Sequence, residues 1–234
     1  MMNFIKLELK RNKLKTYLLA VIGIMAVTFG FLYLYAAIPY IDSETDGAEM
    51  FSTYMGVMGL TSIINMAAFC VLSAAVYSRF VIDEYCGKRA ILLFSYPVSR
   101  RKVFFSKLAV VNLVTVLGLI ACNTIAFTVF LGIEAVFPLV EDTVSIDLVR
   151  ELAIMTLCTS VLAAAIGAIA MSIGFRKKSI PVTFVAAIIL ASVFSSALGN
   201  IGLNAIIGIG IGAVLFGAVI VLARLSNEIT QMEA

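Results

Sequence analysis

Residues 83–101 read DEYCGKRAILLFSYPVSRR, a charged segment that also carries one glycine and one proline. It stands between two long runs, Met50–Ser78 before it and Leu108–Ile133 after it, which contain no charged residue. A helix needs about 20 apolar residues to cross the hydrocarbon core of a bilayer, so either run is long enough. The segment therefore predicts a water-facing insert between two membrane-spanning helices.

The rest of the chain is equally apolar. Of its 234 residues, 62% are hydrophobic and 13% are charged, and the mean hydropathy is +1.09. A soluble domain needs more charge than this to cover its surface. Three further uncharged runs are Thr16–Ile41, Leu152–Phe175 and Ser179–Ala223. The last run has 45 residues, which is enough for two spans, and the GNIG sequence at Gly199–Gly202 is typical of a turn between them.

These runs predict a single all-α membrane domain, residues 1–234, with six transmembrane helices. The expected spans are about 16–38, 50–79, 103–131, 152–175, 179–198 and 203–223. Pro39 is expected to follow the first span, and a separate short amphipathic turn is expected at Ser145–Arg150. Residues 1–15 are expected to form a basic interfacial helix, although a simple basic flank explains them equally well.

The charges predict how the spans are oriented. With six alternating spans, 16 of the 17 basic residues fall on one side, and nine of the 14 acidic residues fall on the other. Short cytoplasmic loops are enriched in Lys and Arg. We therefore expect both termini and the insert 83–101 in the cytoplasm, in a multi-pass protein of a bacterial plasma membrane.

Several motifs of catalysis and energy conversion are missing from the sequence. The absence of histidine excludes histidine metal sites and Ser-His or Cys-His catalysis. Neither a CxxC pair nor a GxxxxGK[ST] loop occurs, and no expected span has a charged residue near its centre. The chain is therefore predicted to be non-catalytic, to bind no cofactor or metal itself and to have no nucleic-acid partner.

The insert resembles a known family. The residues that carry the resemblance are Glu84, Gly87 and Lys88, the pair Leu92-Leu93, then Pro97-Val98-Ser99-Arg100 and Lys107. They are similar to the region between the second and third spans of ABC-2 type transporter permeases. The expected six spans, cytoplasmic termini and N-terminal interfacial helix match that family too. Lys88 stands where threonine is common, which leaves open which individual residues dock.

This resemblance implies the membrane subunit of an ABC exporter, in which two separate ATPase subunits carry ATP and Mg²⁺ and bind a homo- or heterodimer of permeases. The insert would be the coupling helix that contacts the ATPase. Its docking residues would be Asp83, Glu84, Gly87, Lys88 and Arg89, and its hinge residues Pro97, Ser99 and Arg100. An ordinary positive-inside loop is the alternative, although the length, apolar centre and proline of the insert favour docking. Any re-entrant helix around 193–204 would have to be short.

Polar and small residues within the spans suggest two further features. The candidate polar pathway consists of Asn65, Asn112, Asn123 and Thr124. Such residues more often hydrogen-bond a neighbouring helix than line a path. Gly208 and Gly212 form a GxxxG pair, a weak signal for a helix contact. An ATP-independent channel or facilitator, and a non-transporting immunity or sensor protein, stay open as alternatives. The uncharged spans favour a hydrophobic or amphipathic cargo, including a peptide or drug.

Overall fold

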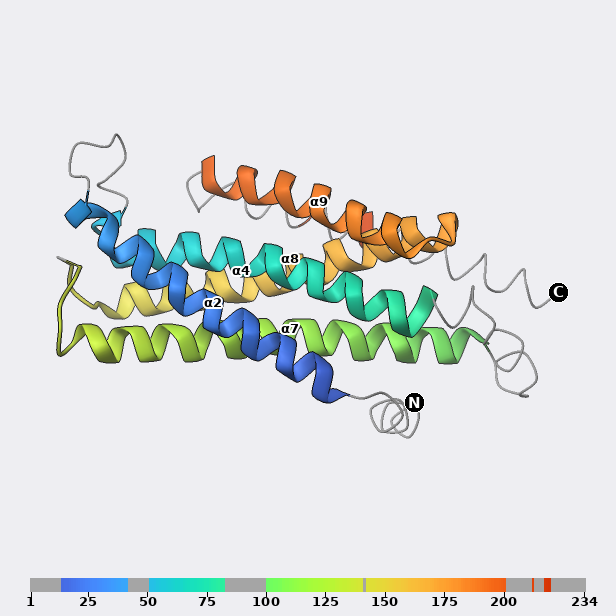
Figure 1. Cartoon of the computed structure of the whole chain (residues 1–234), viewed down its shortest axis with the longest axis horizontal. Coiled ribbons are helices and arrows are strands. Elements are labelled where there is room, and N and C mark those ends of the chain that lie inside the picture. The colour runs from blue at the N-terminus through green and yellow to red at the C-terminus, as the bar shows by residue number, and fades with distance from the viewer. Residues whose placement is uncertain are drawn as a thin grey trace.

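The computed structural model describes residues 14–41, 51–82, 100–140, 142–200, 212 and 217–219. Long helices make up most of this part of the chain and lie side by side (Figure 1). They are α2 (Leu14–Ile41), α4 (Tyr54–Tyr77), α7 (Arg100–Glu134), α8 (Ile146–Lys177) and α9 (Ile180–Asn200). A short π-helical segment, η1 (Ser78–Ile82), continues α4. Among the described residues, five helices are long and apolar enough to cross a membrane.

The all-helical class is thus confirmed for the described residues, and five of the six expected spans correspond to long helices. The sixth expected span, 203–223, lies outside the described residues except for helical positions 212 and 217–219. The expected interfacial helix at 1–15, apart from its last two residues, and positions 83–99 of the insert also lie outside them.

Several helices are longer than the sequence patterns predict. The prediction of a separate turn at 145–150 is wrong, because α8 begins at Ile146 and continues without a break. Ser145 caps this helix by accepting a hydrogen bond from the Leu148 N–H on its Oγ (3.1 Å), which satisfies one of the free N–H groups of the first turn. Pro39 lies inside α2 rather than after it, in the last turn, where it cannot donate the usual hydrogen bond to the carbonyl four residues earlier. Helix α9 extends through Asn200, two residues into the expected turn.

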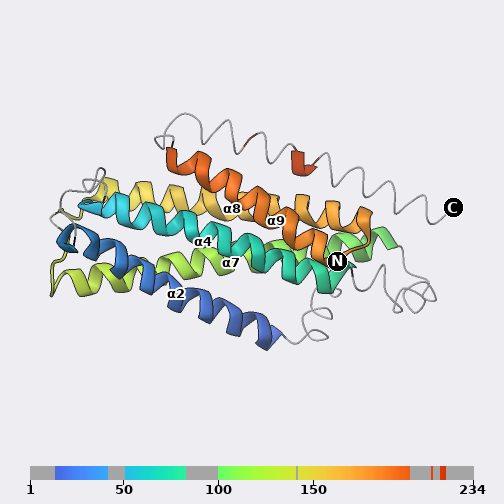
Figure 2. The same ribbon diagram turned by 45° about the horizontal axis from the view of Figure 1, so that its top comes forward.

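Helices α4 and α8 form the centre of the bundle. Helix α4 contacts α2, α7, α8 and α9, and α8 packs against α4, α7 and α9 (Figure 2). Small residues allow the central pair to approach closely, since Gly167 of α8 lies directly against Ser73 of α4. In contrast, only 11% of the most apolar part of α2 is buried, compared with 61% for α8. The outer face of α2 is therefore available to lipid or to another chain.

Charged side chains gather at the two ends of the bundle. Successive helices run in opposite directions (Figure 1), so helix ends that follow one another in the sequence lie together. One end, here the basic end, carries Arg79, Lys107, Arg176, Lys177 and Lys178. The other, the acidic end, carries Glu134, Asp142, Asp147, Arg150 and Glu151. The described helices thus separate charge as the sequence predicts, and the placing of the basic end in the cytoplasm stays a prediction.

A tight turn at the basic end sets the angle between α8 and α9. Lys178 adopts a left-handed conformation (φ 49°), and the N–H of Ser179 donates to the carbonyl of Gly174 at 3.1 Å. This is a common way to end a helix and reverse the chain. The turn brings Thr183 of α9 back onto Gly174, where any larger residue would collide with it.

Candidate functional site: a polar layer and the base of the insert

A set of polar side chains links four helices in the middle of the bundle. The amide Nδ2 of Asn65 donates to Oδ1 of Asn123 at 2.6 Å, and Asn65 Oδ1 accepts from the Thr28 hydroxyl at 2.6 Å. Asn123 Nδ2 in turn reaches the Thr156 hydroxyl at 3.4 Å. These four residues are here called the polar layer. Thr28 belongs to α2, Asn65 to α4, Asn123 to α7 and Thr156 to α8, and all four are buried. The polar layer therefore fastens four otherwise apolar helices in one register.

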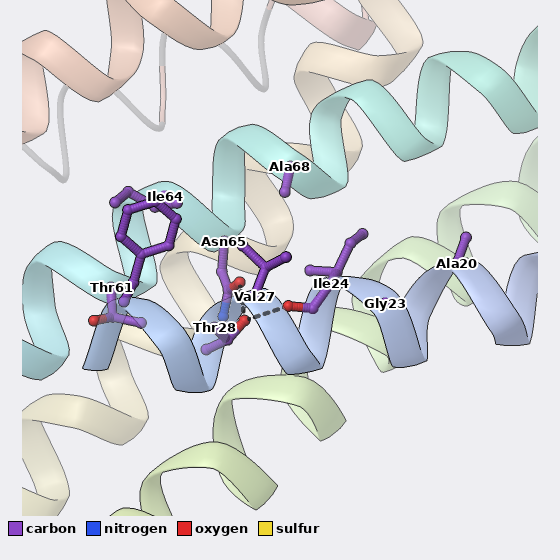
Figure 3. Close-up of a pocket in the computed structure, with 10 residues that line it drawn as sticks. Ala20, Gly23, Ile24, Val27, Thr28, Thr61, Ile64, Asn65 and Ala68 are labelled. Carbon is purple, nitrogen blue, oxygen red and sulfur yellow. Dashed lines mark hydrogen bonds between the residues drawn. The ribbon is translucent and has the colours of Figure 1, made fainter. Parts of the chain in front are cut away.

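Two side grooves reach this layer from opposite pairs of helices. The α2–α4 groove has a volume of about 380 Å³, and Figure 3 shows Thr28 and Asn65 among its lining residues, with mainly apolar side chains around them. The α7–α8 groove has a volume of about 340 Å³ and includes Thr156 together with Thr124. Each groove is thus lined mainly by apolar side chains, with a few polar side chains where it meets the polar layer.

The structure brings together two of the four residues predicted to line a polar pathway. Asn65 and Asn123 form the centre of the polar layer. Asn112 lies elsewhere and accepts a hydrogen bond from the Tyr77 hydroxyl at 2.7 Å. Thr124 is exposed, about 100° around α7 from Asn123, and lines the α7–α8 groove. Sequence reasoning missed Thr28 and Thr156, because threonines are scattered through the spans and no spacing distinguishes these two.

The polar layer is closed in this structure. The Asn65 amide uses its oxygen and its nitrogen on neighbouring side chains, and 2% of Asn65 and 0% of Asn123 is exposed. The single hydroxyl hydrogen of Thr28 can point to Asn65 or back to the carbonyl of Ile24 at 2.8 Å. Hydrogen bonds between membrane helices each contribute about 0.6 kcal/mol on average. The layer therefore acts here as a contact between helices rather than as a hydrated path.

The second feature is the base of the insert, where α4 ends and α7 begins. Lys107 is fully buried, eight residues into the long helix α7, and its Nζ donates to the carbonyl of Phe80 at 3.0 Å. Phe80 belongs to η1, and π-helical turns are rare and frequently occur at functional sites. The ammonium group of Lys107 therefore holds the start of one helix to the irregular end of another.

An apolar cluster reinforces this connection. Phe80 and Val81 of η1 pack in one buried cluster with Phe104 and Leu108 of α7 and Phe175 of α8. The two chain ends from which the insert departs are thus joined to each other and to α8. The predicted docking residues 83, 84, 87, 88 and 89 and hinge residues 97 and 99 lie outside the described residues, whereas Arg100 begins α7. Of the predicted GxxxG pair, Gly208 also lies outside, and no atom of the described residues lies within 4 Å of a Cβ placed at Gly212.

Comparisons with known proteins agree with this architecture. The family model described as "ABC-2 family transporter protein" matches residues 4–197. The chain is also similar to the uncharacterized protein YcbO of Bacillus subtilis (strain 168), with 22% identity over 216 residues, which are 92% of this chain and 93% of the relative. No solved structure matches. Since the family model covers most of the chain, including α2, α4, α7 and α8 and most of α9, this protein belongs to the ABC-2 transporter family.

Proposed function

We propose that this chain is the transmembrane subunit of an ABC exporter, which pairs with a second permease copy and binds two separate ATPase subunits. The observation that carries the proposal is the family match over residues 4–197, in a chain whose spans have no charged residue near their centres and whose sequence has no P-loop. Moving cargo against a gradient needs a source of energy. On this proposal, ATP and Mg²⁺ are bound by the partner ATPase and not by this chain.

The base of the insert supports a mechanical role for residues 83–101. Because Lys107 and the surrounding apolar cluster join η1 to α7, a force on the insert would act on both helices together. Helix α4 contacts every other long described helix, so its displacement would disturb the whole bundle. Packed interfaces of this kind change between discrete arrangements rather than deforming continuously. ATP-driven movement of the insert could in this way alter the packing at the polar layer.

The grooves support a hydrophobic or amphipathic cargo. Both are open at the side of the bundle and lined mostly by apolar side chains, with few hydrogen-bonding groups. A cargo with a large apolar part can reach such a groove from the bilayer itself. The buried, internally hydrogen-bonded polar layer gives less support to an ATP-independent channel, which needs a hydrated path.

The proposal is tested by exchanging the two opposite charges of the insert. The double variant E84K/K88E reverses both predicted docking charges and leaves the net charge of the chain unchanged. We expect co-purification of a P-loop ATPase with the wild-type chain, and at least tenfold weaker association with the double variant. The control K177E changes an exposed charge at the same end of the bundle and should retain the ATPase.

Unchanged association and unchanged stimulation of ATP hydrolysis by E84K/K88E would overturn the docking role of the insert. Transport by the chain reconstituted alone into vesicles, without any ATPase, would overturn the exporter proposal and favour a facilitator.

A further inference from the structure

A buried carboxylate lies at the acidic end of the bundle. Glu134 is the last residue of α7, and only 4% of it is exposed. Its Oε2 accepts hydrogen bonds from the N–H groups of Leu139 (2.9 Å) and Val140 (3.2 Å), and the Tyr54 hydroxyl lies 3.5 Å away. Its other oxygen, Oε1, is equally buried, and among the described residues it has no hydrogen-bond partner. The Tyr33 hydroxyl is also buried and has no partner within the same part of the chain.

Aromatic rings surround this carboxylate. The fully buried ring of Phe130, one turn before Glu134, has its centroid 5.5 Å from the ring of Tyr33 and 6.5 Å from that of Tyr54. The Glu134 carboxylate also interacts electrostatically with both tyrosine hydroxyls. These four residues, here called the acidic-end cluster, come from α2, α4 and α7.

The cluster lacks a positive charge. Burying a carboxylate costs several kcal/mol unless a cation or enough hydrogen bonds compensate. Among the described residues no Lys or Arg forms an ion pair with Glu134, and Arg150, the basic residue described at this end, is exposed. Oxygen Oε1 is therefore a free acceptor for a cation that can donate hydrogen bonds.

We propose that the acidic-end cluster binds the ammonium group of an amphipathic organic amine. An ammonium N–H would donate to Glu134 Oε1 and a second to the Tyr33 oxygen. The positive charge would lie beside the rings of Phe130 and Tyr54, which attract cations. Hard metal ions such as Ca²⁺ take six to eight oxygen ligands, and the described side chains here supply rings instead, so an organic cation fits better.

The apolar part of the amine has a place next to the cluster. Phe127, Leu131 and Leu152 line the α7–α8 groove and also belong to the hydrophobic cluster that contains Tyr54 and Phe130. An aliphatic tail in this groove would thus lie within one helical turn of Glu134. Because both free oxygens are enclosed, the ammonium can enter only after a side chain moves.

The role of the amine as cargo rests on the proposed function, but its binding does not, so binding is measured on the purified chain without any ATPase. The probes are decylammonium and its neutral counterpart decanol, which have the same tail. Glu134→Gln keeps a side-chain oxygen for the N–H groups of Leu139 and Val140 while removing the charge. Tyr33→Phe removes the free hydroxyl, and Glu151→Gln, an exposed acid at the same end, is the matched control.

We expect decylammonium to bind the Glu134→Gln variant about tenfold or more weakly than the wild type, as for loss of a charged hydrogen bond. Tyr33→Phe should weaken it several-fold, whereas Glu151→Gln and all decanol affinities should stay unchanged. Equal decylammonium binding by the wild type, Glu134→Gln and Tyr33→Phe would overturn the inference. Displacement of bound decylammonium by Na⁺ as effectively as by further decylammonium would overturn the inference too, because the site would then bind an alkali ion equally well. If Glu134→Gln does not fold, Tyr33→Phe alone decides.

This result is independent of the exporter proposal. Amine binding that requires Glu134, in a chain that captures no ATPase, would support the site and overturn the proposed function. Capture of an ATPase together with amine binding that does not depend on Glu134 would support the proposed function and overturn the site.

Discussion

Replacing Gly167 by alanine should force the two central helices apart. A Cβ atom at this position would lie 2.9 Å from Ser73 Cβ, still closer to Ser73 Oγ, and 3.5 Å from the ring of Tyr77. Rotation of the Ser73 side chain can relieve the contact with its oxygen, but its Cβ is fixed by the backbone of α4. The helices must therefore separate locally by roughly 0.5–1 Å to restore an ordinary contact.

The cost of the new contact can be measured as the difference in free energy of unfolding between two glycine-to-alanine variants. Extra atoms in a packed core cost about 1–3 kcal/mol. Alanine also gains up to about 1 kcal/mol over glycine from helix propensity, which partly offsets that cost. Gly30→Ala is the matched control, because a Cβ there has no neighbour within 4 Å in the described part of the chain and only the propensity gain applies. Gly167→Ala should therefore be less stable than Gly30→Ala by about 1–3 kcal/mol in free energy of unfolding.

The assay is reversible unfolding of the purified chain in mixed micelles with increasing sodium dodecyl sulfate, followed by circular dichroism. A double-mutant cycle identifies the partner, since Ser73→Gly removes the atoms that the new methyl group meets. The combination S73G/G167A should recover at least 1 kcal/mol relative to the sum of the single changes. Stabilities of Gly167→Ala and Gly30→Ala that agree within about 0.5 kcal/mol would refute the close packing of α4 on α8.

Three further changes test other parts of the structure. Asn123→Leu should lower the free energy of unfolding by about 1–2 kcal/mol, because Nδ2 of Asn65 loses its acceptor, Oδ1 of Asn123. In the same micelle assay, Thr124→Val removes an exposed hydroxyl and should lower the free energy of unfolding by less than about 0.5 kcal/mol. Lys107→Met should lower the free energy of unfolding by about 1–3 kcal/mol. Lys107→Arg should lower it by less, because the arginine can still donate to the carbonyl of Phe80. Equal losses of stability for both variants would contradict this contact. Ser145→Ala should lower the free energy of unfolding by about 1 kcal/mol and speed amide hydrogen exchange in the first turn of α8. Unchanged exchange in this turn would show that the Ser145 cap does not stabilise it.

The helices could be predicted well from sequence because apolar runs of 24 to 29 residues have few other solutions. Their ends could not be predicted as well. The start of α8 lies among polar residues, and only the hydrogen bond from the Leu148 N–H to Ser145 shows that the helix begins there. The extension of α4 by the η1 turn has no signal in its sequence, and the carbonyl of Phe80 in this turn accepts a hydrogen bond from Lys107 of another helix.

The candidate sites could be predicted only in part. Asn65 and Asn123 stand out in the sequence because amides are rare in apolar spans, and the structure pairs them. Thr28 and Thr156 complete the polar layer through helix rotation and packing, which no local pattern encodes. In the sequence, Glu134 looks like one more acidic residue of an external loop. Its burial becomes evident only when the loop residues Leu139 and Val140 fold back onto it.

Whether this permease works as one part of an ATP-driven complex can be measured by capturing the chain intact from native membranes in a mild detergent and weighing the complex by native mass spectrometry. We expect two copies of a 25.1 kDa permease, or one copy with a related permease, together with two P-loop ATPase subunits, and ATP hydrolysis that the E84K/K88E exchange abolishes. A chain that is captured without any ATPase, and that moves cargo or protects cells equally well in its absence, would contradict it.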